Sequence, residues 1–151
     1  NLAVQQAMPR FAAAYPGYDG TGLRDLCQGI HDFYRAHDLA RLTTDMYTSE
    51  LVPRMLPADA WAQLTRGQVD RVPVDELKDR TTAVLLTPYP PGIPLLIPGE
   101  RFNEAIVSYL RFAEAFNQAY PGLETIIHGA ETRTAGGRLR LYVNCLREER
   151  P

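Results

Sequence analysis

The sequence predicts an α+β fold in which helices come first and a small, largely antiparallel sheet with a C-terminal hairpin follows. Three observations support this prediction. Apolar residues recur every three or four positions over residues 23–46 and 103–117, which is the period of a helix packed on one side. Polar and apolar residues alternate over residues 68–74 and 138–143, as in a half-buried strand. A Gly-Gly pair at residues 136–137 then predicts a hairpin turn.

Length and charge narrow the class of protein. The 151 residues fit one domain, which we expect over residues 21–151 after a lead-in over residues 1–20. The chain carries 16 Lys and Arg against 18 Asp and Glu, and a net charge of −2 argues against a nucleic-acid partner. No apolar run approaches the ~20 residues of a membrane helix. The chain opens without Met or a signal segment, so we expect a mature fragment or a domain cut from a longer protein. The expected location is the cytoplasm.

The first half reads as a series of helices. Residues 2–14 predict a short helix that ends at the Tyr-Pro-Gly of residues 15–17. Thr21 or Asp19 is the expected cap of a long helix, and Pro57 is expected to start a further helix that ends at Gly67. The inner stripe of the long helix is Leu23, Leu26, Cys27, Ile30, Phe33, Tyr34 and His37, and it continues less regularly through Leu39, Leu42 and Met46.

The second half mixes strands with one helix. Residues 68–74 and the β-branched run 81–86 predict strands, as do residues 123–134 and 138–146. A helix is expected to begin near Asn103, and the tail over residues 147–151 is expected to fray. The inner stripe of that helix is Ile106, Tyr109, Leu110, Ala113, Phe116 and Asn117.

The most unusual segment is a proline-rich loop, residues 88–100, which holds five of the twelve prolines. Proline fixes φ and lacks an N–H donor, so this segment is expected to be a rigid extended loop with a short edge strand at residues 95–97. A Tyr-Pro bond also has a raised chance of being cis. Such a loop can hold Tyr89 and Glu100 in fixed positions at low entropic cost.

The sequence contains few residues arranged as a catalytic or metal-binding site of its own. His31 and His37 are six residues apart, which is wrong for two metal ligands on a helix, and we expect partly exposed or hydrogen-bonded histidines and no metal. Cys27 and Cys145 allow one disulfide, although two reduced, buried thiols are the favoured interpretation. Fifteen of the 16 basic residues are Arg, so amine chemistry would have to use Lys78.

The string T-P-Y-P-P-G-I-P-L-L-I-P-G-E over residues 87–100 resembles the C-terminal domain of bacterial ornithine/lysine/arginine decarboxylases of the large, aspartate-aminotransferase-like type. Residues 26–34, 66–77 and 120–124 and the terminal hairpin resemble the same family, so the similarity spans roughly residues 20–146. The resemblance implies an enzyme that uses pyridoxal phosphate (PLP) to remove the carboxylate of a basic amino acid. The cofactor lysine of the family follows a histidine in a large central domain, and this chain has no His-Lys pair.

The resemblance therefore implies an appendage that is inactive alone, holds no catalytic, cofactor-binding or metal residue, and packs on the large PLP domain of a dimeric or higher oligomeric parent enzyme. Tyr89, Pro90, Pro91, Gly92 and Glu100 are the candidates for a domain interface or for the entrance of a cationic amino-acid substrate. Glu100 could attract that substrate through its charge, or pair structurally with an arginine, which we favour. A non-catalytic binding or assembly module, docking through residues 93–97, is the alternative function.

Overall fold

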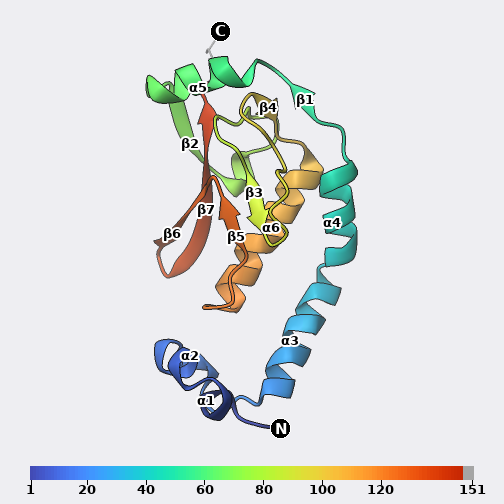
Figure 1. Cartoon of the computed structure of the whole chain (residues 1–151), viewed down its shortest axis with the longest axis vertical. Coiled ribbons are helices and arrows are strands. Elements are labelled where there is room, and N and C mark those ends of the chain that lie inside the picture. The colour runs from blue at the N-terminus through green and yellow to red at the C-terminus, as the bar shows by residue number, and fades with distance from the viewer. Residues whose placement is uncertain (148–151) are drawn as a thin grey trace.

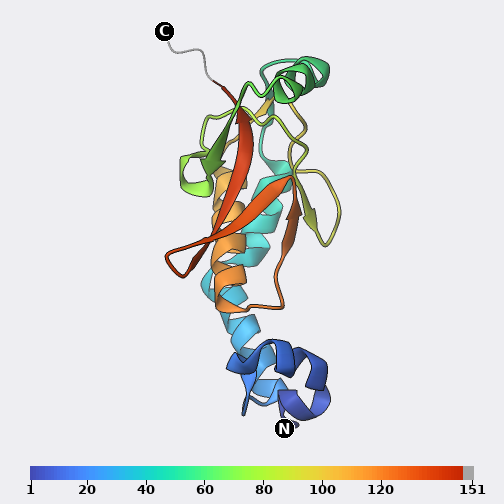
Figure 2. The ribbon, with the colours of Figure 1, turned by 90° about the vertical axis from the view of Figure 1, so that its left-hand side faces the viewer.

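The computed structural model describes residues 1–147 and shows an elongated molecule (Figures 1 and 2). The N-terminal helices lie at one end, and two further helices lead along one side to a body in which a long helix packs against small sheets. The helices are α1 (Val4–Ala7), α2 (Pro9–Ala14), a 3-10 turn η1 (Pro16–Tyr18), α3 (Leu23–Ala36), α4 (Leu39–Thr48), α5 (Pro57–Thr65), a second 3-10 turn η2 (Val74–Glu76) and α6 (Glu104–Ala119). The strands are β1 (Val52–Pro53), β2 (Val69–Pro73), β3 (Thr87–Tyr89), β4 (Glu100–Arg101), β5 (Ile126–His128), β6 (Ala130–Ala135) and β7 (Arg138–Leu146).

The strands form one three-stranded sheet in the order β2-β7-β6 and two pairs, β1-β4 and β3-β5, all antiparallel. The predicted fold class and the C-terminal hairpin are therefore confirmed. The hairpin turns at Gly136 and Gly137, which both have positive φ, as a two-residue turn between twisted strands requires. Along β7, Leu141, Val143 and Cys145 alternate into the core, so this strand has one buried face.

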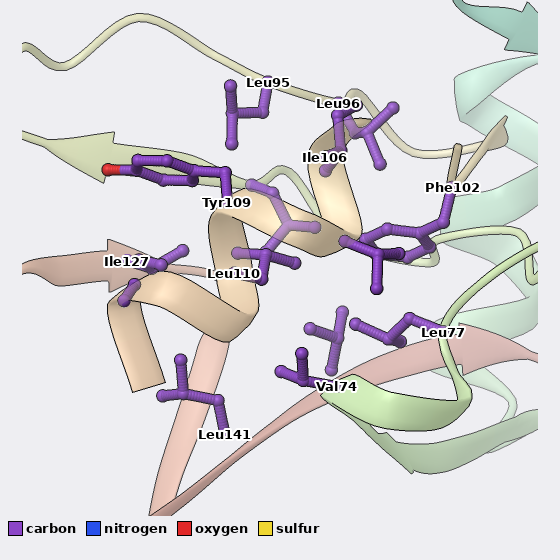
Figure 3. Close-up of a cluster of buried hydrophobic side chains, with 14 of the residues drawn as sticks. Val74, Leu77, Leu95, Leu96, Phe102, Ile106, Tyr109, Leu110, Ile127 and Leu141 are labelled. Carbon is purple, nitrogen blue, oxygen red and sulfur yellow. The ribbon is translucent and has the colours of Figure 1, made fainter. Parts of the chain in front are cut away.

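The core is built around α6, which is covered on two sides. Its predicted stripe is buried, and so are Val107 and Phe112, because α3 and α4 cover a second face of the helix while β7 covers the first. The Phe33 ring of α3 lies 5.9 Å from Phe112. Figure 3 shows Leu95 and Leu96 of the proline-rich loop above α6, and Val74 and Leu77 below it. Asn103 caps the helix as expected, since its Oδ1 accepts from the Ile106 N–H at 3.0 Å.

The helices of the first 37 residues differ from their prediction in three ways. Pro9 divides the expected helix over residues 2–14 into α1 and α2. The N-cap residue of α3 is neither Thr21 nor Asp19 but Gly22, and the Asn1 Oδ1 accepts from the Arg24 N–H of the first turn at 2.9 Å. Two residues of the predicted stripe of α3 are exposed: Cys27 within the helix, and His37, which lies just beyond its last residue. Both cysteines are free thiols, and the prediction of two buried thiols is right for Cys145 but wrong for Cys27, which is exposed.

The irregular stripe after residue 36 marks a change of helix. His37 and Asp38 separate α3 from α4, and Asp38 has φ 49°, in the left-handed region, so the chain turns here. At the other end of the chain the structure describes Arg147, and residues 148–151, where most of the expected frayed tail lies, are outside the described residues.

Two strand predictions were also wrong in their extent. Residues 81–86 form only isolated bridges, because the Thr82 hydroxyl donates to the Val84 carbonyl at 2.7 Å and accepts from the Val84 N–H at 3.1 Å, which closes a local turn. The expected strand over residues 123–134 is split at Gly129, where φ is 91° and a Cβ would overlap the Leu85 carbonyl oxygen. Its first part, β5, therefore pairs with β3, and its second part, β6, pairs with β7.

Candidate functional site

The proline-rich loop begins at the end of β3 and returns over the core to β4. Its second half is anchored by a bridge to Leu86, whose N–H donates to the Leu96 carbonyl at 2.9 Å and whose carbonyl accepts from the Leu95 N–H at 2.8 Å. Leu95 and Leu96 are buried beneath this bridge. The expected edge strand at residues 95–97 is thus one isolated bridge, and residues 88 and 89 belong to β3 rather than to the loop proper.

The tip of the loop is a tight turn. The Gly92 N–H donates to the Pro88 carbonyl at 2.9 Å, and the Tyr89-Pro90 and Pro90-Pro91 peptide bonds are both cis. Gly92 has φ 84°, and a Cβ at this position would meet the Tyr89 ring at 3.3 Å, so both the backbone and the packing favour glycine here. The predicted residues 89–92 therefore lie together, exposed, at the tip.

A tyrosine from α4 ties the loop to the helical side of the domain. The Tyr47 hydroxyl donates to the Ile93 carbonyl at 3.3 Å. Burial raises the pKa of Tyr47 above its ordinary value, so the hydroxyl keeps the proton that it donates. Tyr47 was not among the predicted site residues, because nothing in the sequence indicates that α4 and the loop are neighbours.

Tyr89 ends β3 beside residues of β5 that the sequence also failed to indicate. Tyr89 pairs with Ile126 in the β3-β5 ladder, and its ring lies 6.1 Å from the His128 ring in an edge-on arrangement. Tyr89 is 58% exposed and Ile126 is 56% exposed, while Pro88 and Ile127 face the core. The outer face of this strand pair is therefore largely apolar and open to solvent.

Glu100 lies at the other end of the loop, in β4 beside β1. Its Oε2 accepts from the Ile97 N–H at 2.8 Å, while its own N–H donates to the Ile97 carbonyl at 3.2 Å. Within residues 1–147, no Arg or Lys forms an ion pair with this carboxylate. Among the described residues the partner of Glu100 is thus the backbone of the loop, and the carboxylate holds the turn over residues 97–100 closed.

A covalent site for PLP needs a lysine within an enclosed pocket, and Lys78 does not fit this requirement. Its side chain is 57% exposed, and its Nζ lies 3.3 Å from Glu104 on the surface of α6. Arg111 shares the same carboxylate at 2.9 Å, so Lys78 belongs to a surface charge network. The described part of the chain contains no group of three or more His, Cys, Asp or Glu placed to hold a metal ion, and none of its helices is long and apolar enough to cross a membrane.

The three histidines show no shared site. His31 and His128 are exposed, and the His37 ring stacks on Phe33 with centroids 4.1 Å apart while its Nδ1 lies 2.9 Å from the Phe33 carbonyl oxygen. The expectation of partly exposed or hydrogen-bonded histidines is confirmed.

A hollow of about 310 Å³ lies between β5, the hairpin and the end of α6. Two of its polar side chains are already engaged, since the Asn117 amide both donates to and accepts from the Thr125 backbone, and Glu124 accepts from the Gly122 N–H. The remaining lining is mainly apolar and includes Ile126, Ile127, Ala130, Leu139 and Leu141. The hollow therefore offers apolar contact surface rather than a set of reactive groups.

Comparison with known proteins shows the family to which this chain is similar. The family described as "Orn/Lys/Arg decarboxylase, C-terminal domain" matches residues 40–147. Lysine decarboxylase LdcA of Pseudomonas aeruginosa is 41% identical over 98% of this chain and 20% of its own length, and the constitutive lysine decarboxylase of Escherichia coli is 36% identical over 87% of this chain and 19% of its own. The chain thus spans about a fifth of the length of these relatives.

Solved structures give the same result. Lysine decarboxylase A from Pseudomonas aeruginosa superimposes with a TM-score of 0.88 at 41% identity, over 97% of this chain and 20% of that one. The constitutive lysine decarboxylase of Escherichia coli superimposes with a TM-score of 0.85 at 34% identity, over 97% of this chain and 21% of that one. The chain therefore belongs to the family of ornithine/lysine/arginine decarboxylase C-terminal domains.

Proposed function

We propose that this chain is the C-terminal domain of a PLP-dependent decarboxylase of lysine, ornithine or arginine, and that it packs on the large domain of that enzyme and shapes the active-site entrance with its proline-rich loop. The observation that supports this function best is the loop itself, which is anchored by Leu95 and Leu96 and presents the exposed Tyr89 at a rigid tip. Related proteins carry the names of lysine, ornithine and arginine decarboxylases.

In this proposal the chemistry belongs to the rest of the parent enzyme. The single lysine of the chain is held in a surface ion pair, so the cofactor would be bound outside these 151 residues. This chain would contribute position and shape, because a loop with fixed φ angles can border an entrance without losing entropy when substrate passes. The isolated chain is then expected to be inactive.

The test compares the full parent enzyme with the chain alone. We expect the full enzyme to show PLP absorbance and to release CO₂ and the matching amine from one of the three basic amino acids, and the chain alone to do neither. Decarboxylation by the isolated chain, or a full enzyme that neither binds PLP nor acts on any of the three, would contradict the proposal.

The role of the loop at the entrance needs its own variant. Gly92→Ala in the full enzyme disturbs the tip, because the added Cβ meets the Tyr89 ring and the backbone has positive φ. We expect a changed KM for the amino acid with the fold intact. Gly20→Ala is the matched control, since Gly20 also has positive φ but nothing lies within 4 Å of its Cβ position. Equal kinetic constants in the Gly92 and Gly20 variants would place the loop away from the entrance.

An assembly module without catalytic partners is the alternative, and the exposed apolar tip is the observation that favours it. The same comparison separates the two functions, because an assembly module has no need of a decarboxylating parent chain.

A further inference from the structure

We propose that the surface by which this chain docks on the rest of its parent enzyme is centred on the outer face of the β3-β5 pair, and that an apolar side chain of the enzyme's remaining part occupies the hollow beside Ile126. This inference rests on the proposed function and extends it from the proline-rich loop to residues of α4 and β5. We call Tyr47, Tyr89, Ile93, Ile126 and His128 the docking face.

The docking face is continuous although its residues come from four separate segments. Tyr47 reaches the Ile93 carbonyl at 3.3 Å, and the neighbouring Gly92 lies directly against the Tyr89 ring. Tyr89 in turn pairs with Ile126 across the ladder and lies 6.1 Å from the His128 ring. Contacts therefore run without a break from α4 across the loop tip to β5.

The side chains of the docking face are apolar or aromatic, yet most of them are largely exposed to solvent. Tyr89, Ile93 and Ile126 are each more than half exposed, at 58%, 54% and 56%, and Tyr47 is 37% exposed. Single exposed apolar residues are common on proteins, but a contiguous group with aromatic members is typical of a surface that another part of a protein covers.

The hollow of about 310 Å³ adjoins this face and shares Ile126 with it. Its apolar walls, from β5, β6 and β7, could bury one large side chain of a partner surface. Side chains that fill such pockets contribute a large share of the binding energy of an interface, while the surrounding contacts exclude water. We therefore expect an aromatic or long aliphatic residue in the hollow.

The face is also preorganised for docking. The loop tip is closed by the Gly92–Pro88 hydrogen bond, and the β3-β5 ladder fixes Tyr89 and Ile126 in register. A rigid surface loses little conformational entropy when it binds, so more of the gain from apolar burial remains as affinity.

The occupant that we infer is the part of the parent enzyme outside these 151 residues. The relatives are about five times as long as this chain, since it covers 20% of LdcA, so about four fifths of such an enzyme lies elsewhere in its chain. Because the chain matches a C-terminal domain, the rest of the enzyme would be joined to it covalently. That part would therefore always be available as a partner, in a one-to-one ratio. Domains of one chain commonly meet through interfaces of mixed apolar and polar character.

Hydroxyl-radical footprinting of the full-length, PLP-loaded enzyme tests the inference without relying on activity. The oxidation rates of Tyr89 and His128 in the native enzyme are compared with the rates of the same residues in the urea-unfolded enzyme. We expect about tenfold protection or more, since the centre of an interface loses most of its solvent contact. Tyr89 is 58% exposed in this chain alone, so an uncovered face should be oxidised only about twofold more slowly than in the unfolded enzyme. Protection as small as this would overturn the inference.

A pair of variants then tests whether β5 takes part. Ile126→Asp places a charge on a surface that is exposed in this chain, so the domain itself should fold, but the charge would be buried at the interface. We expect Tyr89 oxidation to rise several-fold in Ile126→Asp and to stay unchanged in the control Ile126→Val. Unchanged protection in both variants would exclude β5 from the interface.

Two further outcomes keep this inference separate from the proposed function. An enzyme that decarboxylates its substrate but shows unprotected Tyr89 and His128 contradicts the docking face and leaves the proposed function intact. Protection that disappears on dilution of the enzyme to single subunits would mean that a second copy covers the face, which also overturns the inference.

Discussion

The carboxylate of Glu100 is expected to support the proline-rich loop rather than attract substrate, and two variants separate these roles. Glu100→Gln removes the charge but keeps an oxygen that can accept from the Ile97 N–H, whereas Glu100→Ala removes the acceptor. A hydrogen bond to a charged acceptor contributes about 1.5–3 kcal/mol when buried. Glu100 is only half-buried, so we expect a loss of about 1 kcal/mol for the Ala variant and about half of that for Gln.

The opposite hypothesis predicts a kinetic effect of known size. One carboxylate about 10 Å from a substrate ammonium group in water contributes about 0.4 kcal/mol, or about a twofold change in affinity. That contribution would be visible at low ionic strength and screened at 0.1 M salt, where the Debye length is about 10 Å. If Glu100 acts only on the loop backbone, KM in Glu100→Gln stays equal to the wild-type value at both salt concentrations.

The assays are urea unfolding of the chain followed by circular dichroism, and the KM of the parent enzyme measured at low and high salt. Asp19→Asn, on the exposed N-terminal segment, makes the same change in net charge far from the loop along the chain and serves as the control. A KM that rises about twofold in Glu100→Gln at low salt only, with no change in Asp19→Asn, would refute the structural role. Equal stability of Glu100→Ala and wild type would refute the hydrogen-bond argument.

Three further predictions concern stability and pH. Gly99→Ala should destabilise the chain by about 3 kcal/mol, because Gly99 has φ 93° and its Cβ would overlap a backbone carbonyl oxygen; urea unfolding should show only about 1 kcal/mol for Gly20→Ala, where the space is open. Asn103→Ala should cost about 1–2 kcal/mol in the same assay, because it removes the cap of α6, and an unchanged midpoint would argue against the cap. Hydrogen bonds from Lys78 and Arg111 hold the pKa of Glu104 below its usual value of 4.5, so their stabilisation is complete above pH 4.5 and is lost as the pH falls through the lowered pKa. The difference in unfolding free energy between wild type and Lys78→Met should therefore shrink over that acidic range, and a difference that is constant with pH would contradict this.

The sequence was most informative where local chemistry decides the structure. The cap at Asn103 and the three-and-four spacing after it predicted α6 and six of its buried residues. The Gly136-Gly137 pair predicted the hairpin, since positive φ at both turn positions is an intrinsic preference of glycine. Long-range contacts were beyond this reasoning. The hydrogen bond from the Arg24 N–H to the Asn1 Oδ1 joins residues 23 positions apart, and neither partner carries a local pattern that indicates the other.

The candidate site also contains residues that local sequence predicted and residues that only long-range packing brings together. The conspicuous prolines predicted a rigid loop and selected Tyr89 and Gly92, which do lie together at its tip. Tyr47, Ile126 and His128 could not be predicted, because their place beside the loop depends on the packing of α4 and on the break at Gly129 that sends β5 to β3. A break at one glycine thus reassigns a strand to another partner, and with it decides which side chains surround the loop.

The proline-rich loop has a buried part that stabilises the domain and an exposed part that is free to contact a partner. Leu95 and Leu96 are buried, and each should contribute the ~1.5–3 kcal/mol that burial of a leucine side chain brings. Ile93, only two residues earlier, is 54% exposed and contributes little to the isolated domain. Pro94 lies between them and restricts its own φ and the conformation of Ile93, so the exposed tip is held in place by the buried anchor. The buried anchor and the hydrogen bonds of the tip therefore hold it in place, while its apolar side chains stay exposed and available to a partner.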